Sequence, residues 1–80
     1  MKTIRVYYYA VLREARGRPE DTVKTNAGTA RELYEELQKQ HGFRWSSEKL
    51  KVAINDEITD WATVLKSNDE VAFLPPVAGG

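Results

Sequence analysis

The last six residues of the chain, PPVAGG at positions 75–80, are the stretch best suited to chemistry. The α-carboxylate of Gly80 is ionised at neutral pH and can attack an activated phosphate. Gly79 and Gly80 have no Cβ, so this end of the chain can enter a tunnel that is too narrow for a side chain. The sequence therefore predicts a thin, reactive terminus.

The residues before the two glycines hold that terminus away from the domain. Pro75 and Pro76 favour an extended polyproline geometry, and Val77 and Ala78 continue the apolar tail, so we expect these four residues to direct it. Six extended residues span roughly 20 Å at about 3.3 Å each. A frayed terminus without function is the alternative, but frayed tails are usually polar and this one is apolar and uncharged.

The rest of the chain offers no catalytic constellation. There are no cysteines, and the single histidine, His41, is expected in the last turn of a helix, where an imidazole complements the helix dipole. Asp56, Glu57 and Asp60 lack the fixed spacing of a calcium loop and are expected to solvate a turn. We therefore expect a chain that is not an enzyme on its own and holds no metal and no tightly bound cofactor.

The composition is that of one small globular domain. The chain has 80 residues, 41% of them hydrophobic, and 12 basic residues balance 12 acidic ones. Scattered charges of both signs argue against binding to nucleic acid, which needs clustered Lys and Arg. The sequence has neither a run of about 20 apolar residues nor a signal peptide, so we expect a cytoplasmic protein that does not bind membranes.

The aromatic residues of the first and last predicted strands suggest an interaction surface. In TIRVYYYA, Ile4, Val6 and Tyr8 share one face of a strand, and in EVAFL the same holds for Val71 and Phe73. If these two strands are neighbours, four residues form one patch on the opposite face: Tyr7, Tyr9, Ala72 and Leu74. Tyrosines with apolar neighbours are typical of protein interfaces, although strands also tolerate tyrosine on a solvated face.

One long helix is predicted over TARELYEELQKQHG, residues 29–42. Thr29 and Glu32 form a capping box, and Gly42 suits the left-handed residue that ends a helix, with Phe43 packing behind it. An apolar stripe follows the helical period: Ala30, Leu33, Tyr34 and Leu37.

The remaining elements complete the fold. We expect a short helix over residues 10–16, a second strand in DTVKTN that is antiparallel to the first, a loop over residues 43–49 and a third strand over 50–54. Asn55-Asp56 marks a turn, and short irregular pieces follow, with Trp61, Val64 and Leu65 in the core. This order predicts an α+β fold, the ubiquitin-like β-grasp roll, with a mixed sheet and one main helix packed on one face. The domain is expected over residues 1–74 and the flexible tail over 75–80.

The run DEVAFLPPVAGG, residues 69–80, resembles the C-terminus of the small subunit of molybdopterin synthase, the MoaD-type sulfur carriers of the MoaD/ThiS ubiquitin-like family. Near the other end, RVYYYAVLREARG resembles the family's first strand and its Leu-Arg-Glu turn, here Leu12, Arg13 and Glu14. Length and element order also agree. Leu74 stands where an aromatic residue is common in the family, and Tyr8 and Tyr9 stand where phenylalanines are, which leaves the strength of the partner interface open.

The resemblance implies a mechanism. An E1-like enzyme would adenylate Gly80 with ATP, and a persulfide donor would convert it to a thiocarboxylate. The tail would then donate this sulfur to cyclic pyranopterin monophosphate in the large subunit, which would form a heterotetramer with the small one. Gly79 would give clearance, Tyr9 and Leu74 would pack against the partner, and Arg13 would contact the adenylating enzyme.

Other readings of the same tail remain open at this point. The chain could carry sulfur for thiamine or for tRNA thiolation, or it could be a ubiquitin-like modifier that is attached to lysines of other proteins. A plain binding module with an inert tail is the third possibility.

Overall fold

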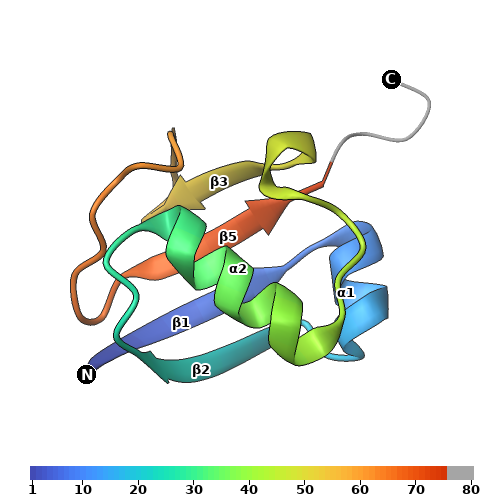
Figure 1. Ribbon diagram of the computed structural model, residues 1–80, viewed down its shortest axis with the longest axis horizontal. Coiled ribbons are helices and arrows are strands. Elements are labelled where there is room, and N and C mark those ends of the chain that lie inside the picture. The colour runs from blue at the N-terminus through green and yellow to red at the C-terminus, as the bar shows by residue number, and fades with distance from the viewer. Residues whose placement is uncertain (76–80) are drawn as a thin grey trace.

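A computed structural model describes residues 1–75 (Figure 1). Five strands form one sheet, and two α-helices and one short 3₁₀ helix connect them. In chain order, the elements are β1 (Lys2–Tyr8), α1 (Ala10–Arg16), β2 (Glu20–Thr25), α2 (Ala30–His41), η1 (Ser47–Lys49), β3 (Lys51–Ile54), β4 (Glu57–Thr59) and β5 (Glu70–Leu74).

The sheet has the order β2-β1-β5-β3-β4, so the first and last strands of the described residues lie side by side in its centre. β1 and β5 run parallel, with Val6 opposite Val71 and Tyr8 opposite Phe73. The β1–β2, β5–β3 and β3–β4 pairs are antiparallel. The predicted mixed sheet and the predicted neighbouring of its first and last strands are both confirmed.

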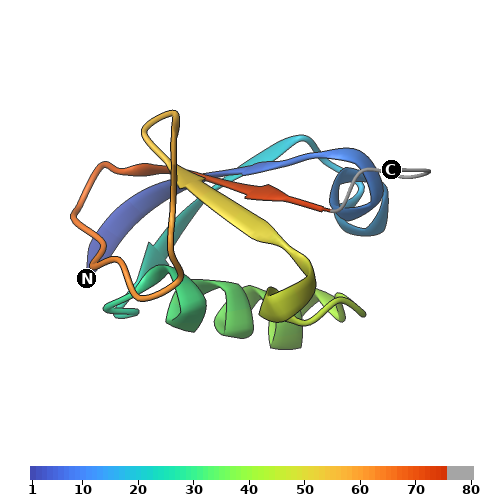
Figure 2. The same cartoon turned by 90° about the horizontal axis from the view of Figure 1, so that it is seen from above.

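α2 crosses one face of the sheet and leaves the other face open, as Figure 2 shows. The inward-facing residues of β1 and β5 meet the apolar stripe of α2, and all four stripe residues are buried. The largest fully buried side chains are Tyr8, Tyr34 and Phe73, and the Tyr34 and Phe73 rings meet edge to face with centroids 5.1 Å apart. The predicted assignment of strand faces is therefore confirmed for β1 and β5.

The ends of α2 are specified by the residues that the sequence pointed to. The Thr29 side chain accepts a hydrogen bond from the Glu32 backbone N–H, 3.2 Å away, and Gly42 ends the helix at φ 72°. Glu32 does not return its bond to Thr29, as a capping box would require. Its carboxylate instead accepts the backbone N–H of Gly28 at 2.7 Å, one residue before Thr29.

Three further details of the sequence prediction are wrong, all of them between α2 and β5. Val64 was expected in the core but is 67% exposed, whereas its neighbour Leu65 is 1% exposed and Trp61 packs against the core. The segment expected to be a loop contains η1, and the stretch expected to be irregular contains β4. The Asn55-Asp56 turn is confirmed: both residues have a left-handed backbone, at φ 52° and 70°, as a two-residue hairpin turn requires.

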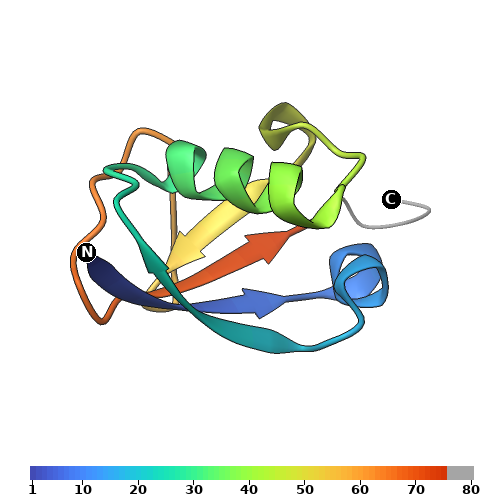
Figure 3. The same ribbon diagram turned by 60° about the horizontal axis from the view of Figure 1, so that its bottom comes forward.

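Figure 3 shows α1 beside the end of the sheet at which β5 finishes, so the short helix and the point where the tail begins lie at the same end of the molecule. Within residues 1–75, neither helix combines the length and the apolar composition that crossing a membrane requires.

Candidate functional site: the tail root and the open sheet face

The tail begins where the central strand β5 ends, at Leu74, and Pro75 is the last residue that the structure describes. We call the end of β5 together with Pro75 the tail root. The predicted roles of Pro76, Val77, Ala78, Gly79 and Gly80 fall on residues outside the described range. Because β5 is paired on both sides, by β1 and by β3, the tail root has a fixed position on the domain.

Next to the tail root, the open face of the sheet carries a row of four residues, one from each of four adjacent strands. Tyr7 on β1 is opposite Ala72 on β5, Ala72 is opposite Ala53 on β3, and Ala53 is opposite Ile58 on β4. Residues that are opposite one another in a sheet point to the same face. We call these residues the open-face row: Tyr7, Ala72, Ala53 and Ile58.

The open-face row is an apolar surface with one prominent exposed side chain. Ile58 is 64% exposed, Tyr7 and Ala72 are half-buried, and Ala53 is 8% exposed. Exposed apolar side chains that line up across a sheet are typical of a protein-binding surface. The next row is charged, with Arg5 opposite Glu70, so the apolar surface has a polar border on that side.

Tyr9 and Leu74 extend this surface toward the tail. Leu74 is opposite Lys51 and lies on the open face. Tyr9 follows the last residue of β1 and precedes α1, with an extended backbone at φ −127° and ψ 151°, so its side chain leaves on the side opposite that of buried Tyr8. It is 49% exposed. The structure thus brings together the four residues of the predicted patch, with Tyr9 just beyond the strand.

Ala53 and Ile58 are the residues of this surface that the sequence prediction missed, and Ile58 is the exposed one of the two. The signal was the pair Asn55-Asp56, because a two-residue turn fixes the register of the hairpin and sets Ile58 opposite Ala53. The sequence prediction treated residues 57–70 as irregular. It therefore expected no strand over residues 57–59 and assigned Ile58 to neither face of the sheet.

Arg13, the other residue predicted to contact a partner, is exposed on α1. It lines a surface hollow together with Glu14 and Arg18, among others. The hollow lies on the short helix rather than on the open sheet face, so Arg13 is at the same end of the molecule as the tail root but not part of the open-face row.

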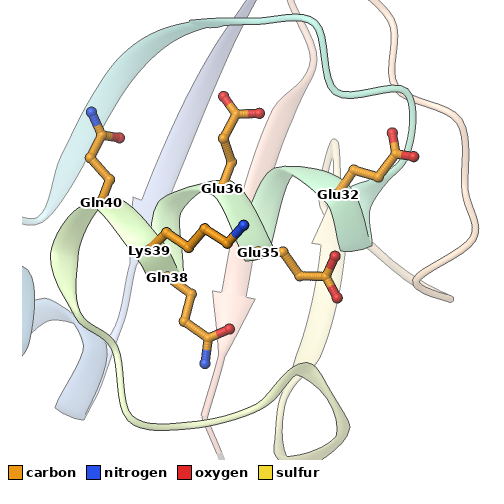
Figure 4. A pocket seen from close by; sticks show the side chains of 6 residues that line it. All are labelled: Glu32, Glu35, Glu36, Gln38, Lys39 and Gln40. Carbon is orange, nitrogen blue, oxygen red and sulfur yellow. The ribbon is translucent and has the colours of Figure 1, made fainter.

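A surface hollow of about 800 Å³ lies along α2 and is not a convincing site. Its residues all come from this one helix, and Figure 4 shows their side chains pointing in different directions rather than toward a common point. Two of its carboxylates are already used, since Glu36 accepts from the Thr25 hydroxyl and Glu32 from Gly28. In the described part of the chain, no group of three metal-ligating side chains is arranged to hold an ion.

His41 is the last residue of α2, as predicted. Burial lowers the pKa of His41, the nearby Arg16 lowers it further, and Asp21 opposes the shift only in part. A neutral imidazole contributes little to the helix dipole. His41 therefore packs as a ring, with its centroid 5.6 Å from that of Phe43.

A mixed sheet with a parallel central pair and one covering helix defines a ubiquitin-like β-grasp domain. A family model described as "ThiS family" matches residues 6–80. The chain belongs to the ThiS family, and the resemblance seen in its sequence is confirmed.

Curated relatives match over nearly all of their length. The molybdopterin synthase sulfur carrier subunit of Mycobacterium tuberculosis is 36% identical, with all of both chains covered. The protein of the same name from Haemophilus influenzae is 35% identical, with 96% of this chain and 99% of the relative covered.

Solved structures agree with this family. A putative molybdopterin converting factor, subunit 1, from Pyrococcus furiosus has a TM-score of 0.81 and 28% identity, over 96% of this chain and all of the other. Small archaeal modifier protein 1 from Methanosarcina acetivorans has a TM-score of 0.80 and 26% identity, with 100% of this chain and 98% of the other covered. A chain in the complex of subunits 1 and 2 of molybdopterin-converting factor from Helicobacter pylori has a TM-score of 0.69 and 28% identity, with 98% of this chain and 99% of the other covered.

Proposed function

We propose that this chain is the sulfur carrier subunit of molybdopterin synthase, a subunit without catalytic activity of its own that delivers sulfur to a large catalytic subunit. The observation that carries the proposal is the end-to-end similarity to curated relatives of that name, within a family match that includes the Gly79-Gly80 terminus. No reacting side chain is needed, because the group that carries the sulfur is the terminal carboxyl of Gly80.

The chemistry of that terminus runs in three steps. An E1-like enzyme joins the Gly80 carboxylate to the α-phosphate of ATP, which releases pyrophosphate and forms an acyl-adenylate. A persulfide then displaces AMP and forms an acyl disulfide, which a thiol cleaves to leave the thiocarboxylate on Gly80 and a disulfide on the donor side. In the large subunit, sulfur passes to cyclic pyranopterin monophosphate, and water restores the carboxylate. ATP is consumed by the partner, and this chain retains no cofactor.

The open sheet face and the tail root provide the docking surface for the large subunit. Tyr9, Leu74 and the open-face row form an apolar area beside the place where the tail leaves, so a partner that covers this area also receives the tail. The Helicobacter pylori neighbour was solved as a complex of subunits 1 and 2, which supports this choice of partner. We propose a heterotetramer with two copies of each subunit, contact of Arg13 with the adenylating enzyme, and activity in the cytoplasm.

The test follows the sulfur directly. The chain is incubated with ATP, an E1-like adenylating enzyme and a persulfide donor, treated with a thiol-alkylating reagent, and its intact mass is recorded. Because the chain has no cysteine, an alkylated adduct that maps to Gly80 establishes the carrier. Alkylation is decisive because oxidation of Met1 adds nearly the same mass as the exchange of oxygen for sulfur. A variant that lacks Gly79 and Gly80 is the matched control and gives no adduct.

Absence of an adduct, when a known carrier reacts under the same conditions, overturns the proposal. The similarity to small archaeal modifier protein 1 then favours the alternative of a modifier attached to lysines. Covalent conjugates of the chain in a cell lysate distinguish that alternative from an inert tail. Transfer of the sulfur to a thiamine precursor or to tRNA, in place of the pterin, identifies a carrier for another product.

A further inference from the structure

One carboxylate of the molecule points into the protein and is not explained by sulfur transfer. Asp21 on β2 is opposite Val6, on the face of the sheet that α2 covers, and it is only 9% exposed. A buried carboxylate is costly unless it is paired and hydrogen-bonded. Asp21 therefore needs partners that compensate its charge in the folded state.

Three groups from different parts of the chain bind this carboxylate. The Tyr8 hydroxyl, at the end of β1, donates to Oδ2 at 2.9 Å. Arg16, in the last turn of α1, donates from Nε to Oδ2 at 2.7 Å and from Nη2 to Oδ1 at 3.1 Å, a two-point ion pair. Arg18 adds an outer contact at 3.4 Å. The Asp21 carboxylate thus joins β1, α1 and β2.

Helix α1 has few other attachments. It has seven residues, too few for a helix to be stable in isolation, and its first residue, Ala10, has the left-handed φ of 50°. No side chain caps its first turn, and Leu12 is its only buried residue. The Arg16–Asp21 ion pair is therefore the second point, besides Leu12, at which α1 is fixed to the domain.

The position of α1 determines part of the proposed docking surface. Tyr8 is opposite Phe73, so the chain enters α1 beside the last residues of β5, and the helix lies at the tail root (Figure 3). Tyr9 and Val11, two of the large apolar side chains that remain exposed, are at the start of α1. A rotation of α1 would move both of them relative to Leu74.

We propose that the network of Tyr8, Asp21 and Arg16 is a latch that holds α1 at the tail root, and that Asp21 is thereby a positioning residue for docking of the large subunit. The partner in this inference rests on the proposed function. The latch itself rests on the buried carboxylate and its three-element bonding, whatever the partner is.

The test compares two substitutions that remove the same charge. Asp21→Asn breaks the latch, and Asp56→Asn changes an exposed carboxylate in the β3–β4 turn, at a left-handed position that Asn tolerates. Amide hydrogen exchange is measured on the full chain at a temperature where both variants stay folded. For Asp21→Asn we expect exchange in residues 12–16 to rise by about tenfold or more, with α2 unchanged, because the loss affects a local unit.

Binding is measured on the same proteins with the large subunit of molybdopterin synthase from the same source. We expect the dissociation constant of Asp21→Asn to rise by about fivefold or more and that of Asp56→Asn to stay within about twofold, since misplaced interface groups weaken binding without unfolding the chain. Tyr8→Phe keeps the ring and the ion pair and removes one hydrogen bond, so it gives a smaller effect of the same kind and serves if Asp21→Asn does not fold.

The proposal is overturned if α1 exchanges as slowly in Asp21→Asn as in the unmodified chain, or if α1 loosens and binding stays at the level of Asp56→Asn. Failure of the unmodified chain to bind the large subunit has a different meaning. It sinks the proposed docking and this role of Asp21 with it, while the exchange result still decides whether the latch fixes α1.

Discussion

Tyr7 and Ala72 lie directly opposite each other in the parallel pair formed by β1 and β5, and both point to the face of the sheet that no helix covers. Because β1 and β5 come from the two ends of the described chain, a partner that touches this pair contacts both ends at once. The row continues through Ala53 to Ile58, so the surface crosses four of the five strands.

Substitution of Ile58 tests the open face as a docking surface. Ile58→Asp places a charge at the most exposed position of the open-face row, where it does not disturb the core. We expect binding to the large subunit to weaken by at least about tenfold, or about 1.4 kcal/mol, because the loss of an apolar anchor that dominates an interface costs about 2 kcal/mol or more. Titration calorimetry with the large subunit measures the change.

Val64→Asp is the matched control for this experiment. Val64 is as exposed as Ile58, at 67%, but lies outside the open-face row, between β4 and β5. Equal loss of affinity in both variants would mean that the open-face row has no special part in binding.

The contrast between Val64 and Leu65 gives a prediction about stability. Leu65→Ala removes a side chain that is 1% exposed, and we expect the free energy of unfolding to fall by about 2–5 kcal/mol. Val64→Ala should change it by less than about 0.5 kcal/mol, as is usual for exposed positions. Urea denaturation of the two variants, followed by tryptophan fluorescence, checks both values. A larger loss for Val64→Ala than for Leu65→Ala would contradict the assignment of these neighbours.

His41 makes the stability depend on pH in a defined direction. Burial, and after it Arg16, lowers the pKa of His41 below its ordinary 6.5, so the unfolded chain binds a proton more readily than the folded one. The contribution of His41 to the free energy of unfolding is therefore fully present above about pH 6.5. It is lost as the pH falls through the lowered pKa of the folded state.

We expect His41→Gln to lose less stability than the unmodified chain between about pH 6.5 and 5, because the variant has no imidazole to protonate. The urea midpoint at each pH measures the stability of both proteins. The two proteins share every other titratable group, so the difference between their curves reports His41 alone. Parallel pH curves for the two proteins over this interval would argue against a half-buried, neutral imidazole.

Ala10 has a backbone conformation that suits glycine better than alanine. Its φ of 50° is left-handed, which costs an L-residue roughly 1–2 kcal/mol. Ala10→Gly relieves that cost and adds freedom to the unfolded chain, so we expect a net gain of up to about 1 kcal/mol in the free energy of unfolding.

Ala15→Gly makes the same chemical change inside α1, at a position with no positive φ. Here we expect a loss of about 0.5–1 kcal/mol, because glycine is a poor helix former. The two variants should therefore shift the thermal midpoint in opposite directions. A loss of stability in both would show that the Tyr9–Ala10 bend is not strained.

Most of the architecture was predictable from local patterns in the sequence. Alternation in residues 3–9 and 70–74 assigns the faces of the two central strands, and the apolar stripe and caps of α2 are set by nearby residues. The errors fall where short elements follow one another. In residues 57–70, Val64 and Leu65 are adjacent and both apolar, and only the path of the chain over the sheet decides which one is buried.

The site was predictable to the extent that it depends on alternation. Tyr7, Tyr9, Ala72 and Leu74 were found because they oppose the buried residues of their own strands. Ile58 was missed because its face depends on a hairpin register, and Asp21 was missed because a single carboxylate in a polar strand reveals nothing of its partners on β1 and α1. Contacts between distant segments are what these sequence patterns do not encode.

β5 lies at the centre of the sheet and ends at the tail root, so both the folding of the domain and the presentation of its C-terminus depend on this strand. Until residues 70–74 are made, β1 and β3 have no strand between them, and the core lacks Val71 and Phe73. A chain interrupted before this strand would expose two unpaired edges, which is a hazard for aggregation rather than a functional carrier. Since the same strand ends at the tail root, a chain can present its terminus in the right place only after its own sheet has closed. A copy that ends before β5 therefore has neither a complete open face nor a tail to load.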